Sequence, residues 1–156
     1  MKLYPLLSED MVLARLQGRS REDVLREMVD HLRSRKGSGF GDDLVEKLLA
    51  REELGTTAIG GGIAIPHCKV RGLKAPVLVL GLSREGVPFP SVDGGATHVI
   101  FLVVSPLENP NVNLRVLAAI SKLVRQSRTL TSKLLMAPTA GEALRTMREE
   151  EDGPHG

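Results

Sequence analysis

The sequence predicts an α/β domain in which helices cover both faces of a mixed β-sheet. Two near-continuous apolar runs of strand length, PVLVLGL at 76–82 and HVIFLVV at 98–104, are typical of central strands buried on both faces. Other segments place apolar residues at helical spacing before and after these runs. Helices and strands are mixed along one chain of 156 residues without an internal repeat, so we expect one domain.

The first elements are expected to be a short strand at 12–16 and a helix. Ser20 with Asp23 three residues later has the form of a capping box, and Gly37 is placed to end the helix. Between them, apolar residues recur at helical spacing: Val24, Leu25, Met28, Val29 and Leu32.

A second helix is expected after the break at 37–39, which reads Gly-Ser-Gly. Asp42 or Asp43 can cap this helix, and its apolar face continues until shortly before Gly55. The next segment, TTAIGGGIAIP at 56–66, has β-branched residues around three glycines and ends in a proline, which cannot sit in a central strand. We expect two extended pieces there, joined by a bulge or a tight turn.

The segment between the two apolar runs, GVPFPSVDGG at 86–95, has prolines and glycines that suit an edge strand and turns. Asp93-Gly94 is its sharpest turn signal. The two apolar runs on either side of this segment are expected to pair antiparallel.

Three helices are predicted in the C-terminal part of the chain. Asn111 or Asn113 can cap the first of them, and a short helix is expected near 130–136. Thr139 and Glu142 form a capping box for the last helix.

The chain length bounds the domain organisation. A chain of 156 residues can bury a core of its own without disulfide or metal support. The final stretch is acidic and then rich in glycine and proline, so it is expected to fray. We therefore expect a single domain at 1–149 and a flexible tail at 150–156.

The composition argues against several classes of function. The 21 basic and 19 acidic residues are mixed along the chain, and this leaves no basic stripe for nucleic acid. The chain has no Trp, one Tyr and three Phe, too few for a platform on which bases stack. No apolar stretch is long enough to enter a membrane. The single cysteine, Cys68, permits no internal disulfide, so we expect a reducing, cytoplasmic location.

Among the four histidines, His67 is the candidate for chemistry. It follows a glycine-rich run and a proline, so its ring is expected at the end of an extended segment that other atoms can approach. A neutral imidazole there can offer a nucleophilic nitrogen. His31, His98 and His155 are expected to be structural or solvent-exposed.

Residues near this histidine in the sequence have the chemistry of an oxyanion site. Arg51 supplies a planar guanidinium, Thr56 and Thr57 supply hydroxyls, and the glycine run that includes Gly61 and Gly62 supplies backbone N–H groups. These groups predict a phosphate-binding lining.

The same residues also admit other interpretations. Arg51 can instead pair with Glu46 or Glu52 on the helix surface, while the glycines form a simple turn. Gly55 and Gly60 have the spacing of a Walker A loop, but no lysine follows the second glycine, and no dinucleotide fingerprint is present.

A metal site is not expected. His67 and Cys68 are adjacent, and neighbouring residues of an extended chain point to opposite faces. The sequence has no carboxylate cluster that would hold a metal, and we expect no cofactor.

The segment LLAREELGTTAIGGGIAIPH at 48–67 resembles the enzyme IIA domain of the bacterial phosphotransferase system, fructose/mannitol class, which includes a nitrogen-regulatory branch. The residues that match the family pattern are Arg51, Glu52, Thr57, Gly62, Ala64, Ile65, Pro66 and His67. Phe89, Asp93-Gly94 and HVIFLVVSP extend the resemblance to about 5–149.

The resemblance implies a three-layer α-β-α domain with a mixed central sheet of about five strands. It further implies that His67 takes a phosphoryl group from the phosphorylated carrier HPr and passes it to a IIB partner or uses it as a regulatory signal. Arg51 would stabilise charge beside it, and no metal is required.

One position departs from the family pattern. A second histidine, in the pair His-Leu, usually opens the helix after the proline-containing loop, and here that pair is Asn113-Leu114. Asn113 can still donate an amide N–H to phosphate. The departure raises an alternative function, a IIA-like module that contacts partners without efficient transfer. The absence of a fused IIB domain or membrane span favours a stand-alone regulatory form.

Overall fold

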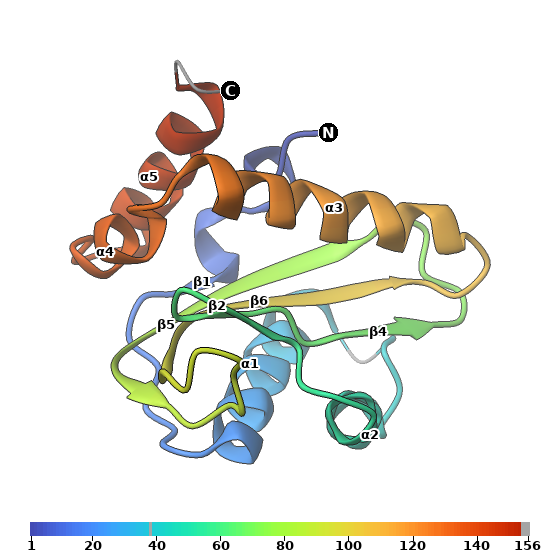
Figure 1. The fold of residues 1–156 in the computed structure, drawn as a ribbon. Helices are drawn as coiled ribbons and strands as arrows, with labels where there is room; N and C mark the ends of the chain where they lie inside the picture. Colours follow the sequence, from blue (N-terminus) through green and yellow to red (C-terminus); the bar gives the residue numbers. More distant parts are fainter. Residues whose placement is uncertain (38, 154–156) are drawn as a thin grey trace.

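The computed structural model describes residues 1–37 and 39–153, and in them a β-sheet lies between two layers of helices (Figure 1). This confirms the predicted three-layer α/β fold, with a sheet of six strands where about five were expected. The expected break at Ser38 and the expectation for His155 lie outside the described residues.

The elements follow the chain in an order that mixes strands with helices. The strands are β1 (Val12–Leu13), β2 (Ala58–Gly60), β3 (Ile63–Ala64), β4 (His67–Val70), β5 (Val77–Val87) and β6 (Thr97–Pro106). The helices are α1 (Arg21–Lys36), α2 (Leu44–Glu53), α3 (Pro110–Gln126), α4 (Leu130–Leu135) and α5 (Ala140–Asp152), and two short 3₁₀ turns, η1 (Tyr4–Leu6) and η2 (Glu9–Met11), precede β1.

The sheet is mixed, and the two apolar runs form its centre. β5 and β6 pair antiparallel, with Leu80 opposite Phe101, as the sequence predicts. β1 pairs parallel with β5, β3 and β4 pair parallel with β6, and β2 pairs antiparallel with β3. The strand order is β1-β5-β6-β3-β2, and β4 extends the β3 side of β6.

Two apolar clusters, one on each face of the sheet, hold the layers together. Alternate residues of β6 divide between them, because successive side chains of a strand point to opposite faces. Phe101 and Val103 pack towards α3, α4 and α5, whereas Leu102 and Val104 pack towards α1 and α2. Figure 1 shows α3 on one side of the sheet and α1 with α2 on the other.

The predicted capping boxes are present at two helices. The Ser20 side chain accepts a hydrogen bond from the Asp23 N–H, and that of Thr139 accepts one from the Glu142 N–H. Gly37 ends α1 at φ 88°, a conformation that glycine adopts without strain.

Other local predictions need correction. Residues after Val87 form turns and no edge strand until Thr97, because prolines there cannot donate to a ladder. Asn109 occupies the N-cap of α3, where Asn111 or Asn113 was expected. Pro110 follows it at the first helical position, where its missing N–H costs no hydrogen bond.

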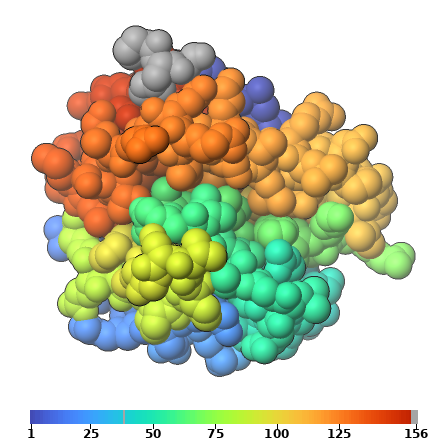
Figure 2. Space-filling view, in the orientation of Figure 1, coloured from blue at the N-terminus to red at the C-terminus, as the bar shows by residue number. Residues whose placement is uncertain are grey.

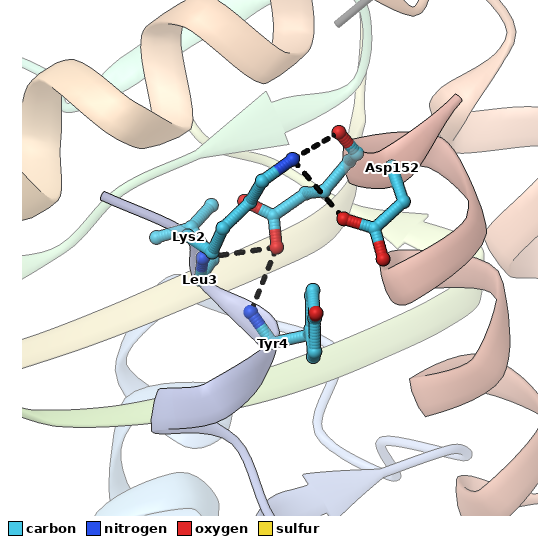
Figure 3. A network of polar contacts seen from close by, with 5 residues as sticks. Lys2, Leu3, Tyr4 and Asp152 are labelled. Carbon is cyan, nitrogen blue, oxygen red and sulfur yellow. Dashed lines mark hydrogen bonds and ion pairs between the residues drawn. The ribbon is translucent and has the colours of Figure 1, made fainter. Parts of the chain in front are cut away.

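Residues 150–152, which were expected to belong to a flexible tail, are part of a helix. α5 continues through Asp152, and the carboxylate of Glu151 accepts hydrogen bonds from the N–H groups of Leu3 and Tyr4 at 2.7–2.9 Å. Lys2 forms an ion pair with Asp152 at 3.1 Å. Figure 3 shows the N-terminal segment lying against the last turn of α5. Contacts with the other end of the chain therefore order this acidic stretch.

Candidate phosphoryl-acceptor site

His67 begins a strand, and this corrects the expectation that it ends one. β3 and β4 both run along β6, and the chain is interrupted between them at Pro66, which has no N–H for the ladder. Pairing resumes when the Pro66 carbonyl accepts from the Val103 N–H at 2.9 Å, and His67 then lies opposite Val103. The parallel register points the ring towards the α3 side of the sheet.

One contact determines which ring nitrogen of His67 is free. Nδ1 lies 2.8 Å from the carbonyl oxygen of Ile65. Because a carbonyl can only accept, Nδ1 carries the proton in this contact. Nε2 is then left with the lone pair that a nucleophile needs. The side chain is half-buried, so part of it is open to solvent.

A groove of about 570 Å³ contains this histidine. It lies where β4 runs between α2 and α3, at the right of Figure 1. The groove is lined by Lys47, Ala50, Arg51, Leu54, His67, Cys68, Lys69 and Asn113. Three predicted site residues from three separate elements, namely His67, Arg51 and Asn113, are therefore brought together.

Arg51 lies in the last turn of α2 and reaches the groove from there. Its Nη1 donates to the carbonyl oxygen of Gly55 at 2.8 Å. Glu52 is turned into the protein, where its carboxylate accepts from the N–H and hydroxyl of Thr57 at 3.1 and 2.5 Å. Among the described residues, Arg51 forms no ion pair with Glu46 or Glu52. The surface-pair interpretation of Arg51 is therefore not seen.

Asn113 lies in the first turns of α3 and is 5% exposed. Its Oδ1 accepts from the Ser105 hydroxyl at 3.1 Å. The side chain is therefore part of the groove wall and does not cap the helix.

Two predicted glycines lie elsewhere. The Gly62 carbonyl accepts from the N–H of His98 on β6, whereas His67 lies opposite Val103. These two points on β6 are five residues apart, or about 16 Å at roughly 3.3 Å per residue. Gly61 donates its N–H to Asp93 at 3.1 Å. The expectation that Gly61 and Gly62 line the phosphate site is corrected, because the chain between them and His67 is extended.

The predicted threonines are also used elsewhere. Thr57 is buried and donates its hydroxyl to Glu52, while the Thr56 hydroxyl accepts from the Ala58 N–H at 3.1 Å. Neither is among the residues that line the groove. These hydroxyls shape the turn between α2 and β2, and the expectation that they bind phosphate is corrected.

Asp93 contacts the glycine turn between β2 and β3. Its carboxylate accepts from the Gly95 N–H, the Ser91 hydroxyl and the Gly61 N–H, and these bonds lower its pKa to about 2. Figure 2 shows the segment around 90, in yellow, against the segment around 60, in green. The β2–β3 turn is thus fastened to this loop.

Sequence reasoning missed two lysines and a leucine in the groove. Lys47 lies four residues before Arg51 on the same helix, and residues at this spacing share a face. Lys69 lies two residues after His67 and shares its strand face. Both could have been found from spacing alone. Leu54 is 86% exposed beside them, and no local signal marks it.

The charges of the lining favour an anion. Lys47, Arg51 and Lys69 are cationic, and no residue of the lining is acidic. The pair between Lys47 and Asp43, at 3.8 Å between exposed side chains, is weak and leaves the lysine available. Burial raises the pKa of Cys68 to about 11, so its thiol stays protonated and is not a competing nucleophile.

The other described histidines have structural contacts outside the groove. His31 Nε2 lies 2.5 Å from the Asp10 carbonyl oxygen, and His98 Nδ1 lies 2.9 Å from that of Ser83. Within 1–37 and 39–153, no three His, Cys, Asp or Glu side chains gather as metal ligands. In the same ranges no helix is long and apolar enough to cross a membrane.

Comparison with known proteins identifies the family. Residues 5–150 match the family described as phosphoenolpyruvate-dependent sugar phosphotransferase system, EIIA 2. The chain belongs to this family. An EIIA domain is a component of a phosphotransfer system, which accords with a histidine in a cationic groove.

Relatives of this EIIA chain are of two kinds. It is 32% identical to a nitrogen regulatory protein of Pseudomonas aeruginosa over 144 residues, 92% of each chain. It is also 32% identical to the fructose-specific EIIABC component of Bacillus subtilis over 124 residues, 80% of this chain. The chain spans only 20% of that second protein's length.

Solved structures show the same fold. The nitrogen regulatory protein IIA-Ntr of Neisseria meningitidis superposes with a TM-score of 0.78 at 26% identity, covering 93% of this chain and 98% of that one. The complex of mannitol enzyme IIA with phosphorylated enzyme IIB from Escherichia coli gives 0.73 at 18% identity, covering 91% and 96%.

Proposed function

We propose that this EIIA chain is a phosphocarrier that accepts a phosphoryl group on Nε2 of His67. The observation that supports this most is the contact of Nδ1 with the Ile65 carbonyl, which leaves Nε2 free inside a cationic groove. Phosphoryl transfer needs positioning and charge stabilisation, with little covalent machinery beyond the nucleophile. Arg51 and Asn113 supply donors for the equatorial oxygens.

The transfer step needs no metal and no additional base. The lone pair of Nε2 forms a bond to phosphorus while the bond from phosphorus to the donor's leaving atom breaks. The leaving atom keeps the electron pair of that bond. The ring of His67 gains positive charge, which its Nδ1–H shares with the Ile65 carbonyl oxygen.

For the partners, we propose a phosphorylated HPr-like carrier as donor and a IIB domain or a regulated protein as recipient. A mannitol enzyme IIA of the same fold has been solved with phosphorylated enzyme IIB. Nitrogen regulatory proteins of Pseudomonas aeruginosa and Shigella flexneri align with this chain over 92% and 94% of their own length, and this similarity supports a regulatory role. Such a relay would operate in the cytoplasm.

The test is labelling by enzyme I, HPr and phosphoenolpyruvate, read by mass. The native protein should gain one acid-labile phosphate, and His67→Ala should remain folded and unlabelled. His98→Ala is the matched control, because that ring lies outside the groove. Labelling of His67→Ala as strong as the native protein would show that the acceptor lies elsewhere.

A second candidate function is a regulatory module that contacts partners without efficient transfer. Asn113 favours it, since an amide carries no charge and cannot exchange a proton with the ring. In that case the native protein stays unlabelled, and native and His67→Ala proteins bind the partner equally.

A further inference from the structure

Ser105 and Asn113 form a buried pair behind the groove. Ser105 lies on β6 opposite Lys69, is fully buried, and belongs to the same face of the strand as Val103. Its hydroxyl therefore meets α3, and it donates to Oδ1 of Asn113 at 3.1 Å. Among the described residues, neither side chain has another hydrogen-bond partner.

The opposite end of the amide has a different environment. No side-chain nitrogen or oxygen in the described residues is both buried and unpaired, yet Nδ2 of Asn113 has no protein acceptor. Nδ2 must therefore touch solvent. The solvent space that Asn113 lines is the groove of His67. The donor end of the amide therefore has surface open to the groove in which a phosphoryl group would lie.

We propose that Ser105 is a positioning residue, which holds the Asn113 amide so that its N–H groups donate to the phosphoryl oxygens on His67. This inference rests on the proposed function. The orientation matters because the two ends of the amide have opposite polarity. Turned the other way, the amide would place a carbonyl oxygen against an anion and repel it.

The first experiment measures phosphorylation by phosphoramidate, so that recognition of a protein donor does not contribute. The phosphorus–nitrogen bond of phosphoramidate breaks, ammonia leaves, and Nε2 of His67 bonds to phosphorus. Ser105→Ala should slow this reaction about three- to tenfold, the range for one neutral hydrogen bond. Ser105→Thr keeps the hydroxyl on a β-branched side chain that suits a strand, so it should restore the native rate.

Asn113→Ala separates positioning from packing. It should slow the reaction at least as much as Ser105→Ala, and Ser105→Ala should add nothing further in the Asn113→Ala background. Thermal melts of each variant measure stability separately. The inference is overturned if Ser105→Ala slows the reaction equally in the native and Asn113→Ala backgrounds. It is also overturned if Asn113→Ala slows the reaction and Ser105→Ala does not. Either result leaves the proposed function intact.

A second readout requires no transfer. Inorganic phosphate added to ¹⁵N-labelled protein should shift the side-chain amide signal of Asn113 in the native and Ser105→Thr proteins, and much less in Ser105→Ala. If phosphate shifts this signal but His67 is never labelled, the proposed function fails, and only the orientation of the Asn113 amide towards an anion in the groove stands. If the native signal does not shift and His67 is not labelled, both fail.

Discussion

At the scale of single residues, the proposed reactivity of His67 depends on contacts a few ångströms away. The Ile65 carbonyl, two residues earlier, holds the proton on Nδ1. The Ile65 N–H donates to the Thr57 carbonyl, while the Thr57 N–H donates to Glu52. The Ile65 carbonyl is therefore available to the His67 ring. The contact between Ile65 and His67 therefore selects Nε2 as the nitrogen for the proposed transfer.

Arg51 gives the residue-scale prediction. Arg51→Ala should slow phosphoryl transfer to His67 about ten- to a hundredfold, because it removes a charged hydrogen bond to the phosphoryl group worth about 1.5–3 kcal/mol. The melting temperature should change little, since its bond to Gly55 is at the surface. Arg51→Lys keeps the charge without the planar fork and should be intermediate. Transfer at the native rate in Arg51→Ala would remove this residue from the site.

At the scale of elements, short turns determine where the strands can go. The β2–β3 turn uses Gly60, Gly61 and Gly62 at φ between 65° and 88°, where residues with a Cβ are strained. Asp93 then fastens this turn to the loop before β6 through Gly61. This tie fixes the edge of the sheet at the end away from His67.

The hydrogen bonds of the Asp93 carboxylate predict a dependence of stability on pH. The pKa of Asp93 is about 2 in the fold against 3.8 ordinarily, so its contribution is present above about pH 4 and is lost as the pH falls towards 2. Asp93→Asn should therefore be less stable than the native protein at pH 6, and the difference should shrink between about pH 4 and 2. Urea unfolding across this range measures it.

Asp42→Asn is the control, at an exposed carboxylate without a hydrogen bond or ion pair among the described residues. It should leave the pH profile of unfolding unchanged. If the stability of Asp93→Asn depends on pH in the same way as that of the native protein, the carboxylate does not hold the turn.

At the scale of the whole molecule, the two ends of the chain close the layer that carries α3. Glu151 is 8% exposed and accepts from the N–H groups of Leu3 and Tyr4 (Figure 3). Lys2 also donates to the carbonyl oxygen of Glu151 at 2.6 Å. Acidic residues at the end of a helix are unfavourable by themselves, and these donors compensate them.

Loss of this contact gives the third prediction. Glu151→Ala should lower the free energy of unfolding by about 2 kcal/mol, since two backbone N–H groups lose a charged acceptor. For a domain of this size the melting temperature should fall by about 4–8 °C. Glu149→Ala, at an exposed position on the same turn, should have little effect. Equal melting temperatures for the two variants would contradict the contact.

The sequence by itself determined the features that depend on neighbours along the chain. The capping boxes at Ser20 and Thr139 and the buried strands follow from local hydrogen bonding and periodicity, and the choice of His67 as the candidate acceptor follows from the local motif. These signals act within a few residues, so they are visible in the order of the amino acids.

Only the tertiary structure decided which groups share the groove. Arg51 and Asn113 reach His67 from α2 and α3, whereas Gly61, much nearer to His67 in sequence than Asn113, is carried away by an extended strand. The last turn of α5 is likewise held by residues distant in the sequence, with Leu3 and Tyr4 donating to Glu151 and Ser127 donating to Glu150. Such placements follow from strand register and from packing between distant segments, because an extended strand separates close neighbours while the sheet brings remote ones together.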